Sequence, residues 1–289
     1  MKNPICPLCG NVEHEYCFSE NGHQLLTCKH CDLFFIHPYP DESAAHERVA
    51  KGRLGNPARV EADRQYRGSR YGYDRYFPFI DKECVDAKSL LDVGCGTGRL
   101  LELLGKKPGI HRVGIELDPD RAEYARRVAG CEICQVPLEE FEYPSKFDVI
   151  TMINVLSHIP GFDAPFSSIR SLLTDGGKLI LKTGELNRGV RKGAIPNWGI
   201  PEHLHVLGMS TIRFIASRHG YRIVRHEREP LSVRLFSPSK WKAPGRNAAE
   251  HFVKRTVAMT PFALSILRRL YDARYGKKAY SSFIVMSPV

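Results

Sequence analysis

The stretch LLDVGCGTGRLLELL, residues 90–104, decides the fold of this chain. A short apolar run ends in Asp92, three glycines then alternate with small residues, and a leucine-rich helix pattern follows from Arg99. This order predicts a buried strand, a tight turn and a helix start, where bare main chain and unpaired N–H groups can meet a ligand. A dinucleotide fingerprint has the form G-x-G-x-x-G, but here the third glycine comes one residue early, at Gly98.

Strand and helix patterns alternate after this turn. Apolar strand patterns occupy residues 112–116, 147–153, 178–182 and 221–225, and residues 174–177 read as the turn before the third of them. Strands separated by helices predict an α/β fold, Rossmann-like and doubly wound, with a mostly parallel sheet. In such a sheet the ligand lies at the carboxyl ends of the strands.

Polar residues mark helix starts and a candidate ribose site. Asp118 followed by Pro119 predicts an N-cap and a first helical turn, and Ser210 is expected to cap a helix over 211–219. Glu116 ends the second strand 18 residues after the last glycine of the turn. A carboxylate at about this distance can accept both hydroxyls of a ribose.

Four cysteines near the start predict a metal site. Cys6 and Cys9 form one C-x-x-C pair, and Cys28 and Cys31 form another after 18 intervening residues. This spacing is typical of a tetrahedral zinc site, and four sulfur ligands leave no open position, so the metal would be structural. The alternative is a chance group of buried thiols. A further pair, Cys131 and Cys134, has no partner pair and reads as strand thiols.

Composition limits the classes of protein. The chain has 289 residues and a formal charge of +10, so an anionic partner has to be considered beside simple solubility. No apolar run approaches the ~20 residues that span a bilayer, and cysteines stand where a secretory leader would need an apolar run. Nine cysteines without a leader favour a reducing, cytoplasmic location.

The chain divides into three expected parts. Residues 1–40 form a zinc ribbon, residues 41–85 a helical lid or linker, and residues 86–289 the α/β domain. Two helices are expected as an insertion over about 240–279. Eight Lys or Arg against two acids lie over 246–278, so this segment carries much of the basic excess. The two helices are candidates for a lid over the substrate pocket, a binding site for a phosphate-bearing ligand, or an RNA-binding surface. The simplest alternative is a basic face that is only solvated.

The successive motifs resemble those of class I S-adenosylmethionine-dependent methyltransferases, over roughly residues 85–225. The resemblance implies S-adenosylmethionine as cofactor. It places the glycine loop under the methionine part, Glu116 at the ribose, and the backbone of Asn154 and Val155, after the strand 147–153, at the methionine group. Residues 135–138 lack the acid that often binds adenine in this family. The implied cofactor residues are Asp92, Gly94, Gly96, Gly98, Glu116, Leu117, Leu138, Asn154, Val155 and Tyr73.

The ribbon extends the resemblance. A four-cysteine ribbon with a FFIHPYP exit, residues 34–40, is similar to bacterial methyltransferases that tailor sugars and other small metabolites. Sugar C-methyltransferases of that type carry a further large C-terminal domain, for which this chain is too short. That departure puts sugar C-methylation in doubt.

The loop 197–205 holds candidate catalytic residues. His203 with neighbouring Glu202 is the first candidate for a general base, followed by His158 and then His205, because histidine titrates near neutral pH. The alternative is that these histidines only pack or cap the loop. We therefore expect methylation of oxygen or carbon on a small acceptor, which can be phosphate-bearing or carrier-linked. The alternatives are an RNA methyltransferase and a non-enzymatic binding module, and the oligomeric state is not readable.

Overall fold

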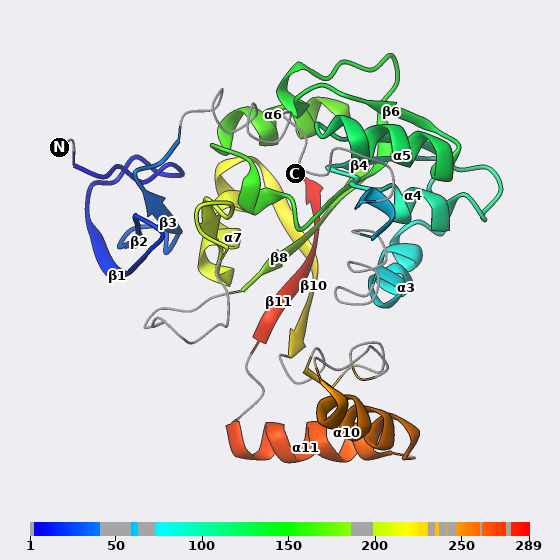
Figure 1. The fold of residues 1–289 in the computed structure, drawn as a ribbon. Coiled ribbons are helices and arrows are strands. Elements are labelled where there is room, and N and C mark those ends of the chain that lie inside the picture. The colour runs from blue at the N-terminus through cyan, green and yellow to red at the C-terminus, as the bar shows by residue number, and fades with distance from the viewer. Residues whose placement is uncertain are drawn as a thin grey trace.

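The computed structural model describes residues 3–40, 59–62, 73–185, 199–230, 235–236, 241, 247–260, 262–275 and 279–289. Two β-sheets lie within these ranges, one of seven strands and one of four (Figure 1). The expected helical segment 41–85 is described only at 59–62 and from residue 73 onward. Asn197 and Trp198 of the candidate loop lie outside the described residues.

The seven-stranded sheet confirms the predicted fold class. Its strand order is β10-β11-β8-β7-β4-β5-β6. The neighbours from β8 to β6 pair in parallel, whereas β11 pairs antiparallel with both β8 and β10. The strands are β4 (Ser89–Val93), β5 (His111–Ile115), β6 (Glu132–Cys134), β7 (Phe147–Ile153), β8 (Leu173–Gly184), β10 (Tyr221–Pro230) and β11 (Ala279–Pro288).

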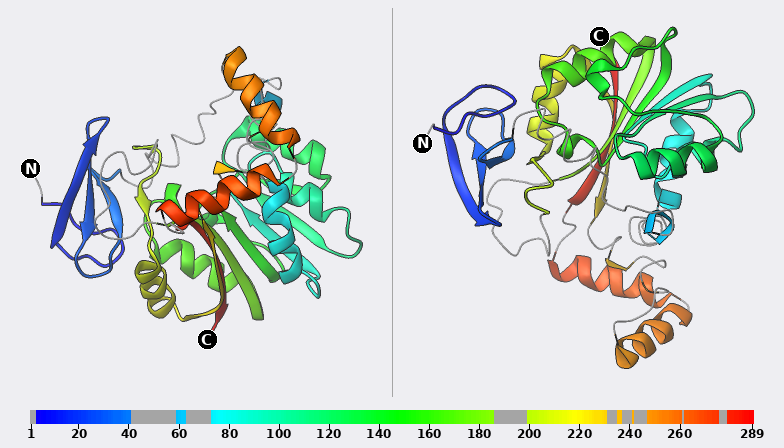
Figure 2. Two further views of the ribbon diagram at one scale, coloured as in Figure 1. Left: turned by 90° about the horizontal axis from the view of Figure 1, so that it is seen from below. Right: turned by 45° about the horizontal axis from the view of Figure 1, so that its top comes forward.

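Helices cover both faces of this sheet (Figure 2). Successive side chains of β4 point to opposite faces, so Leu90 packs in one apolar cluster and Leu91 in the other. The Leu90 cluster includes helices α3, α4 and α5, and the Leu91 cluster includes α6 and α7. The bounds are α3 (Tyr73–Glu83), α4 (Arg99–Leu104), α5 (Pro119–Ala129), α6 (Asp163–Leu172) and α7 (Met209–Arg218), with 3₁₀ turns η1 (Leu138–Glu140) and η2 (Leu156–His158).

The N-terminal sheet contains a strand from the α/β core. Three strands, β1 (His14–Glu20), β2 (His23–Cys28) and β3 (Phe34–His37), form an antiparallel meander. The fourth, β9 (His205–Val206), pairs with β3. The Ile36 amide also donates to the Leu204 carbonyl at 3.0 Å. The cysteine-containing segment therefore holds the candidate catalytic loop directly.

Two helices lie between β10 and β11. They are α10 (Ala248–Met259) and α11 (Ala263–Tyr275). Because β10 runs parallel to the inner strands and β11 runs back, the insertion leaves and re-enters the sheet at its carboxyl edge. Figure 1 shows the pair standing outside the layered core. Nowhere in the described part of the chain is a helix long and apolar enough to cross a membrane.

Local helix signals were partly correct. The Asp118 side chain accepts from the Arg121 amide at 3.1 Å and Pro119 opens α5, which confirms that N-cap. The expected Ser210 cap was wrong, because α7 begins at Met209 and its N-cap is Gly208 in extended backbone. Ser210 is therefore the second residue of the helix, two positions past the N-cap. Strand β8 also begins earlier than expected and includes residues 174–177.

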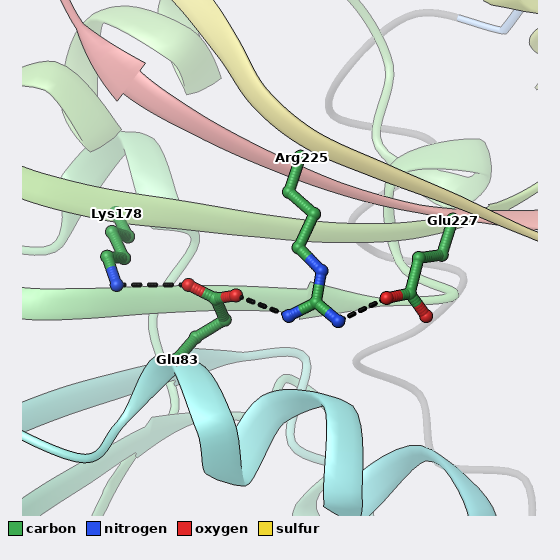
Figure 3. Close-up of polar contacts among 4 residues, drawn as sticks. All are labelled: Glu83, Lys178, Arg225 and Glu227. Carbon is green, nitrogen blue, oxygen red and sulfur yellow. Dashed lines mark hydrogen bonds and ion pairs between the residues drawn. The ribbon is translucent and has the colours of Figure 1, made fainter.

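A charged network fastens α3 to the sheet (Figure 3). Glu83, the last residue of α3, accepts from Lys178 of β8 at 3.0 Å and from Arg225 of β10 at 2.8 Å. Arg225 is also bonded to Glu227. Burial alone would raise the pKa of Glu83, but the hydrogen bonds and charges of the two cations hold that pKa below its ordinary value.

Candidate active site and metal centre

The glycine loop has the backbone that its sequence requires. Gly94, Gly96 and Gly98 have φ of 66°, 58° and 72°, in the left-handed region that favours glycine. A Cβ on Gly94 would stand 2.5 Å from Val155 Cγ2, whereas a Cβ on Gly96 would meet nothing within 4 Å. The middle glycine therefore leaves open space on the side where a ligand can lie against main chain.

Glu116 lies across this loop. One carboxylate oxygen accepts from the Gly96 amide at 2.7 Å and the other from the Asp118 amide at 2.9 Å. The side chain is buried, and burial raises the pKa of its carboxyl, partly offset by these amide donors. Each carboxylate oxygen has a second lone pair that a ribose hydroxyl can use.

Asp92 presents a buried carboxylate at the end of β4. Its Oδ1 accepts from the Thr151 hydroxyl at 2.7 Å, while its Oδ2 has no hydrogen-bond partner in the described part of the chain. Burial raises the pKa of this carboxyl to about 7, with the nearby Glu116 charge acting in the same direction. A cation beside Oδ2 would satisfy the free oxygen and favour the charged form.

The end of β7 borders the same loop. Asn154 has a left-handed backbone with φ of 60°, and its amide donates to the Lys182 carbonyl at 2.9 Å. Its side-chain oxygen accepts from Lys182 Nζ at 2.7 Å, and that ammonium lies 4.5 Å from the centre of the Tyr76 ring. The side chain of the next residue, Val155, lies against Gly94, so the end of β7 borders the glycine loop.

For the remaining expected cofactor residues, the structure gives burial and position in the chain. Leu117 is half-buried directly after Glu116, and Leu138 is buried in η1. Tyr73 is the first residue of α3, but its side chain lies outside what the structure describes. The geometry therefore brings together Asp92, the three glycines, Glu116 and Val155.

The structure brings His158, Glu202 and His203 together. The rings of His158 and His203 lie 4.7 Å apart between centroids. His158 Nδ1 lies 2.8 Å from the Glu202 carbonyl oxygen, to which it can only donate, so Nε2 of a neutral His158 is an acceptor. Glu202 contributes its backbone here, while its side chain is exposed. A Cβ on Gly199 would come within 2.8 Å of His203 Nδ1, so this glycine makes room for the ring.

His205 has a different role. Its side chain is completely buried, and Nε2 lies 2.6 Å from the Leu156 carbonyl oxygen. Nδ1 lies 3.2 Å from the hydroxyl of Tyr39, which follows β3. Burial lowers the pKa of His205 to about 4, which disfavours the charged form. These contacts assign His205 to holding the N-terminal sheet on the core and argue against it as a base.

Sequence reasoning missed several residues that support this site. In the sequence, Lys182, Tyr39 and Gly199 stand out only as residues of a strand, the ribbon exit and a loop. Glu185, which follows β8, is buried, accepts from the Ser282 hydroxyl, and lies 2.8 Å from Arg228 Nη2. A charged or polar residue at the end of a core strand is the signal that could have pointed to Lys182 and Glu185.

Four cysteines form the predicted metal-ligand set. The sulfurs of Cys6, Cys9, Cys28 and Cys31 all lie within 4.8 Å of one another, and the Cys6–Cys31 and Cys9–Cys28 sulfurs are each 3.5 Å apart. Zn–S bonds of about 2.3 Å in a tetrahedron place sulfurs about 3.8 Å apart, so this set fits zinc. In the described ranges, no other group of three or more His, Cys, Asp or Glu side chains gathers in this way.

The two cysteine turns have matching backbones. The Gly10 amide donates to the Cys6 carbonyl at 2.9 Å, and the Asp32 amide donates to the Cys28 carbonyl at 3.1 Å. Each turn closes on a left-handed residue, with φ of 72° at Gly10 and 60° at Asp32. Paired turns of this kind present two sulfurs each toward one point.

A cavity of about 480 Å³ lies in the C-terminal insertion. It is lined mainly by apolar residues, including Phe236, Trp241 and Val253, with Glu250 and Lys254 beside them. None of the expected cofactor or catalytic residues lines it. The cavity therefore does not coincide with the site built around the glycine loop.

Comparison with known proteins agrees with the fold. A methyltransferase domain family model matches residues 63–226. A ubiquinone biosynthesis O-methyltransferase of Idiomarina loihiensis is 31% identical over 128 residues, covering 42% of this chain and 50% of the relative. A fatty-acid O-methyltransferase of Mycolicibacterium smegmatis is 25% identical over 164 residues, covering 54% and 56%. The chain thus spans about half the length of the curated relatives it matches.

Solved structures share the fold at low sequence identity. A phosphoethanolamine N-methyltransferase of Haemonchus contortus has a TM-score of 0.61 at 14% identity, covering 96% of this chain and 71% of the other. The [4+2]-cyclase SpnF has a TM-score of 0.51 at 18% identity, covering 75% and 82%. The second structure shows that this fold also hosts other reactions. The family match covers more than half of the chain, and with the sheet order and glycine loop it shows that this chain belongs to the methyltransferase domain family, with the class I, S-adenosylmethionine-dependent architecture.

Proposed function

We propose that this protein transfers the methyl group of S-adenosylmethionine to an oxygen of a small hydroxylated acceptor. The observation that carries the proposal is the cradle formed by Asp92, the glycine loop and Glu116, which combines an open main-chain surface with two buried carboxylates. The O-methyltransferase names of the relatives support oxygen as the atom methylated. An acidic carbon remains the next acceptor to test.

The chain's residues would hold the cofactor in two places. When bound, S-adenosylmethionine supplies a methyl group already activated by its sulfonium sulfur. Glu116 would accept the ribose hydroxyls, and the free Oδ2 of Asp92 would face the positively charged amino end. The backbone of Asn154 and Val155 would border the methionine part. Positioning is the main task of the protein because the methyl group needs no further activation.

A hydroxyl acceptor needs a base, which the histidine pair can supply. We assign this role to His203, with His158 fixing the loop through the Glu202 carbonyl. In the transfer, the acceptor oxygen forms the bond to the methyl carbon, the carbon–sulfur bond breaks toward sulfur, and His203 takes the hydroxyl proton. A carboxylate acceptor would not need this proton transfer, so the role of His203 also distinguishes the two acceptor classes.

The four-cysteine site would hold a structural Zn²⁺. Four thiolates complete a tetrahedral shell, so the metal would contribute to folding of the N-terminal sheet and leave no position for a substrate. Through the pairing of β3 with β9, this sheet supports the loop that ends in His203 and His205. Zinc would therefore act on methyl transfer only through the position of that loop.

The test combines a turnover assay with a binding measurement. Formation of S-adenosylhomocysteine is followed with a panel of phenols, sugars and carboxylic acids, and S-adenosylmethionine binding is followed by calorimetry. His203→Ala should lower turnover of the best hydroxyl acceptor by 10²-fold or more, typical for a general base, with unchanged cofactor affinity. His111→Ala, on an exposed side chain at the amino end of β5, is the matched control. Equal turnover of both variants would remove His203 from the mechanism.

The alternative, methylation of RNA, rests on the cysteine ribbon and the basic helices. It predicts RNA binding that weakens steeply as salt is raised, because released counterions drive such binding. Absence of RNA binding at low salt would discard it. Failure to bind S-adenosylmethionine would instead favour a non-enzymatic binding module.

A further inference from the structure

The C-terminal helices expose an unusual amount of apolar surface. Phe252 and Met259 of α10, Phe262 between the helices, and Ile266 and Leu270 of α11 are 54–81% exposed. Residues seven apart, such as Phe252 and Met259, and four apart, such as Ile266 and Leu270, lie on one face of a helix. Each helix thus presents an apolar strip to the outside, and such patches mark interaction sites. These five residues are called the outer strip below.

Arginines flank the outer strip. Arg255 lies between Phe252 and Met259 along α10, and Arg268 and Arg269 lie between Ile266 and Leu270 along α11, all with exposed side chains. Residues 247–275 carry five Lys or Arg against two acids. One of these acids, Glu250, is paired with Lys254 at 3.0 Å. The surface around the outer strip is therefore cationic.

Within the described residues, nothing covers this surface. Neither helix has a buried residue among those described, and both stand apart from the layered core in Figure 1 and in the right-hand view of Figure 2. A different part of the pair faces Phe236, whose ring lies 6.2 Å from Trp241 and 5.8 Å from Tyr271 of α11 between ring centroids. The outer strip is thus an additional surface beyond what holds the hairpin together.

We propose that the outer strip and its arginines dock on the surface of an anionic phospholipid bilayer. Helices with an apolar face and basic flanks lie in the membrane interface, where apolar side chains enter the acyl boundary and Lys or Arg meet anionic headgroups. A second copy of the chain on the same face would bring arginines against arginines. Nucleic acid would pair with the arginines and leave Phe252, Phe262 and Ile266 in water.

The two helices join the sheet at the same edge as the glycine loop. The insertion leaves the sheet at the end of β10 and returns at the start of β11, on the carboxyl edge that also carries the glycine loop. Docking would therefore hold the active-site edge of the protein near the lipid. The inference concerns where the protein acts, and it stands whether or not the proposed methyl acceptor is correct.

Vesicle flotation with the full chain tests the proposal. The probes are vesicles of phosphatidylcholine alone and of phosphatidylcholine with 30% phosphatidylglycerol. We expect the protein to float with the anionic vesicles, to remain behind with the neutral ones, and to dissociate as salt is raised. The double variant Phe252→Asn/Phe262→Asn should bind at least tenfold more weakly. Asparagine suits position 262, where φ is 63°.

Matched variants control for general surface effects. Val85→Asn/Val224→Asn changes two exposed valines elsewhere and should float as the unchanged protein does. Arg268→Gln/Arg269→Gln should lose the preference for anionic lipid, whereas Lys106→Gln/Lys146→Gln should keep it. Cofactor binding should be unaffected in all four, which separates this result from the proposed function. No flotation, equal loss in the control pairs, or a dimer broken by the phenylalanine variant without vesicle binding would overturn the proposal.

Discussion

Replacing Gly96 by alanine separates the stability of the glycine loop from its use by a ligand. Gly96 has φ of 58°, so alanine there carries the left-handed cost of about 1–2 kcal/mol. No clash adds to this cost, because the new Cβ would meet nothing within 4 Å. At roughly 2–4 °C per kcal/mol, the melting temperature should fall by about 2–8 °C.

The same methyl group should have a larger effect on cofactor binding. It would occupy the open side of the loop, where the proposed site places S-adenosylmethionine, so the affinity should fall at least tenfold, or about 1.4 kcal/mol. Gly130 is the matched control, since it has φ of 60° after α5 and a Cβ there also meets nothing within 4 Å. Gly130→Ala should lose similar stability and keep full affinity.

The assay is calorimetric titration of S-adenosylmethionine into both variants, with melting curves on the same samples. A selective affinity loss in Gly96→Ala supports the cradle as the cofactor site. Equal affinities in the two variants would refute the reasoning, because the open space beside Gly96 would then not hold the ligand.

Three further predictions concern the supports of this site. Glu83→Gln should destabilise the fold by roughly 1 kcal/mol or less, since its partners Lys178 and Arg225 are about a third exposed. Because the folded-state pKa of Glu83 is lowered, the stability it contributes should be complete above about pH 4.5 and should disappear as the pH falls through the folded-state pKa. Equal acid midpoints for variant and parent in melting curves would contradict this. Removal of zinc by a chelator should speed amide hydrogen exchange at Ile36 and in β9, because the pairing of β9 depends on the N-terminal sheet. Unchanged exchange, measured by mass spectrometry, would show that the metal does not support the loop. Gly199→Ala should lower turnover and leave cofactor affinity intact, because its Cβ would displace the His203 ring, and full turnover would count against His203 as the base.

Local signals in the sequence were sufficient for much of the fold. The glycine turn, the Asp118 cap and the two C-x-x-C pairs each depend on residues close together in the chain, and all were found where expected. The parallel sheet followed from strands separated by helices, which allow few other arrangements. The Ser210 cap failed because glycine at position 208 also begins helices.

Long-range pairings were not accessible from the sequence. Strand β9 has two residues and pairs with a strand about 170 positions earlier, so no periodic pattern announces it. His205 looked like a catalytic candidate because it is polar and near His203, yet its burial and its contact with Tyr39 depend on that pairing. The Glu83 network likewise joins three elements that are distant in the chain.

The central claim is that the glycine loop and the Glu116 carboxylate together bind S-adenosylmethionine. Its most direct test is equilibrium titration of S-adenosylmethionine and S-adenosylhomocysteine into the purified, zinc-loaded chain and into Glu116→Ala. The account predicts one site per chain for both ligands and at least tenfold weaker binding in the variant. No saturable binding to the parent protein, or equal binding to Glu116→Ala, would contradict it.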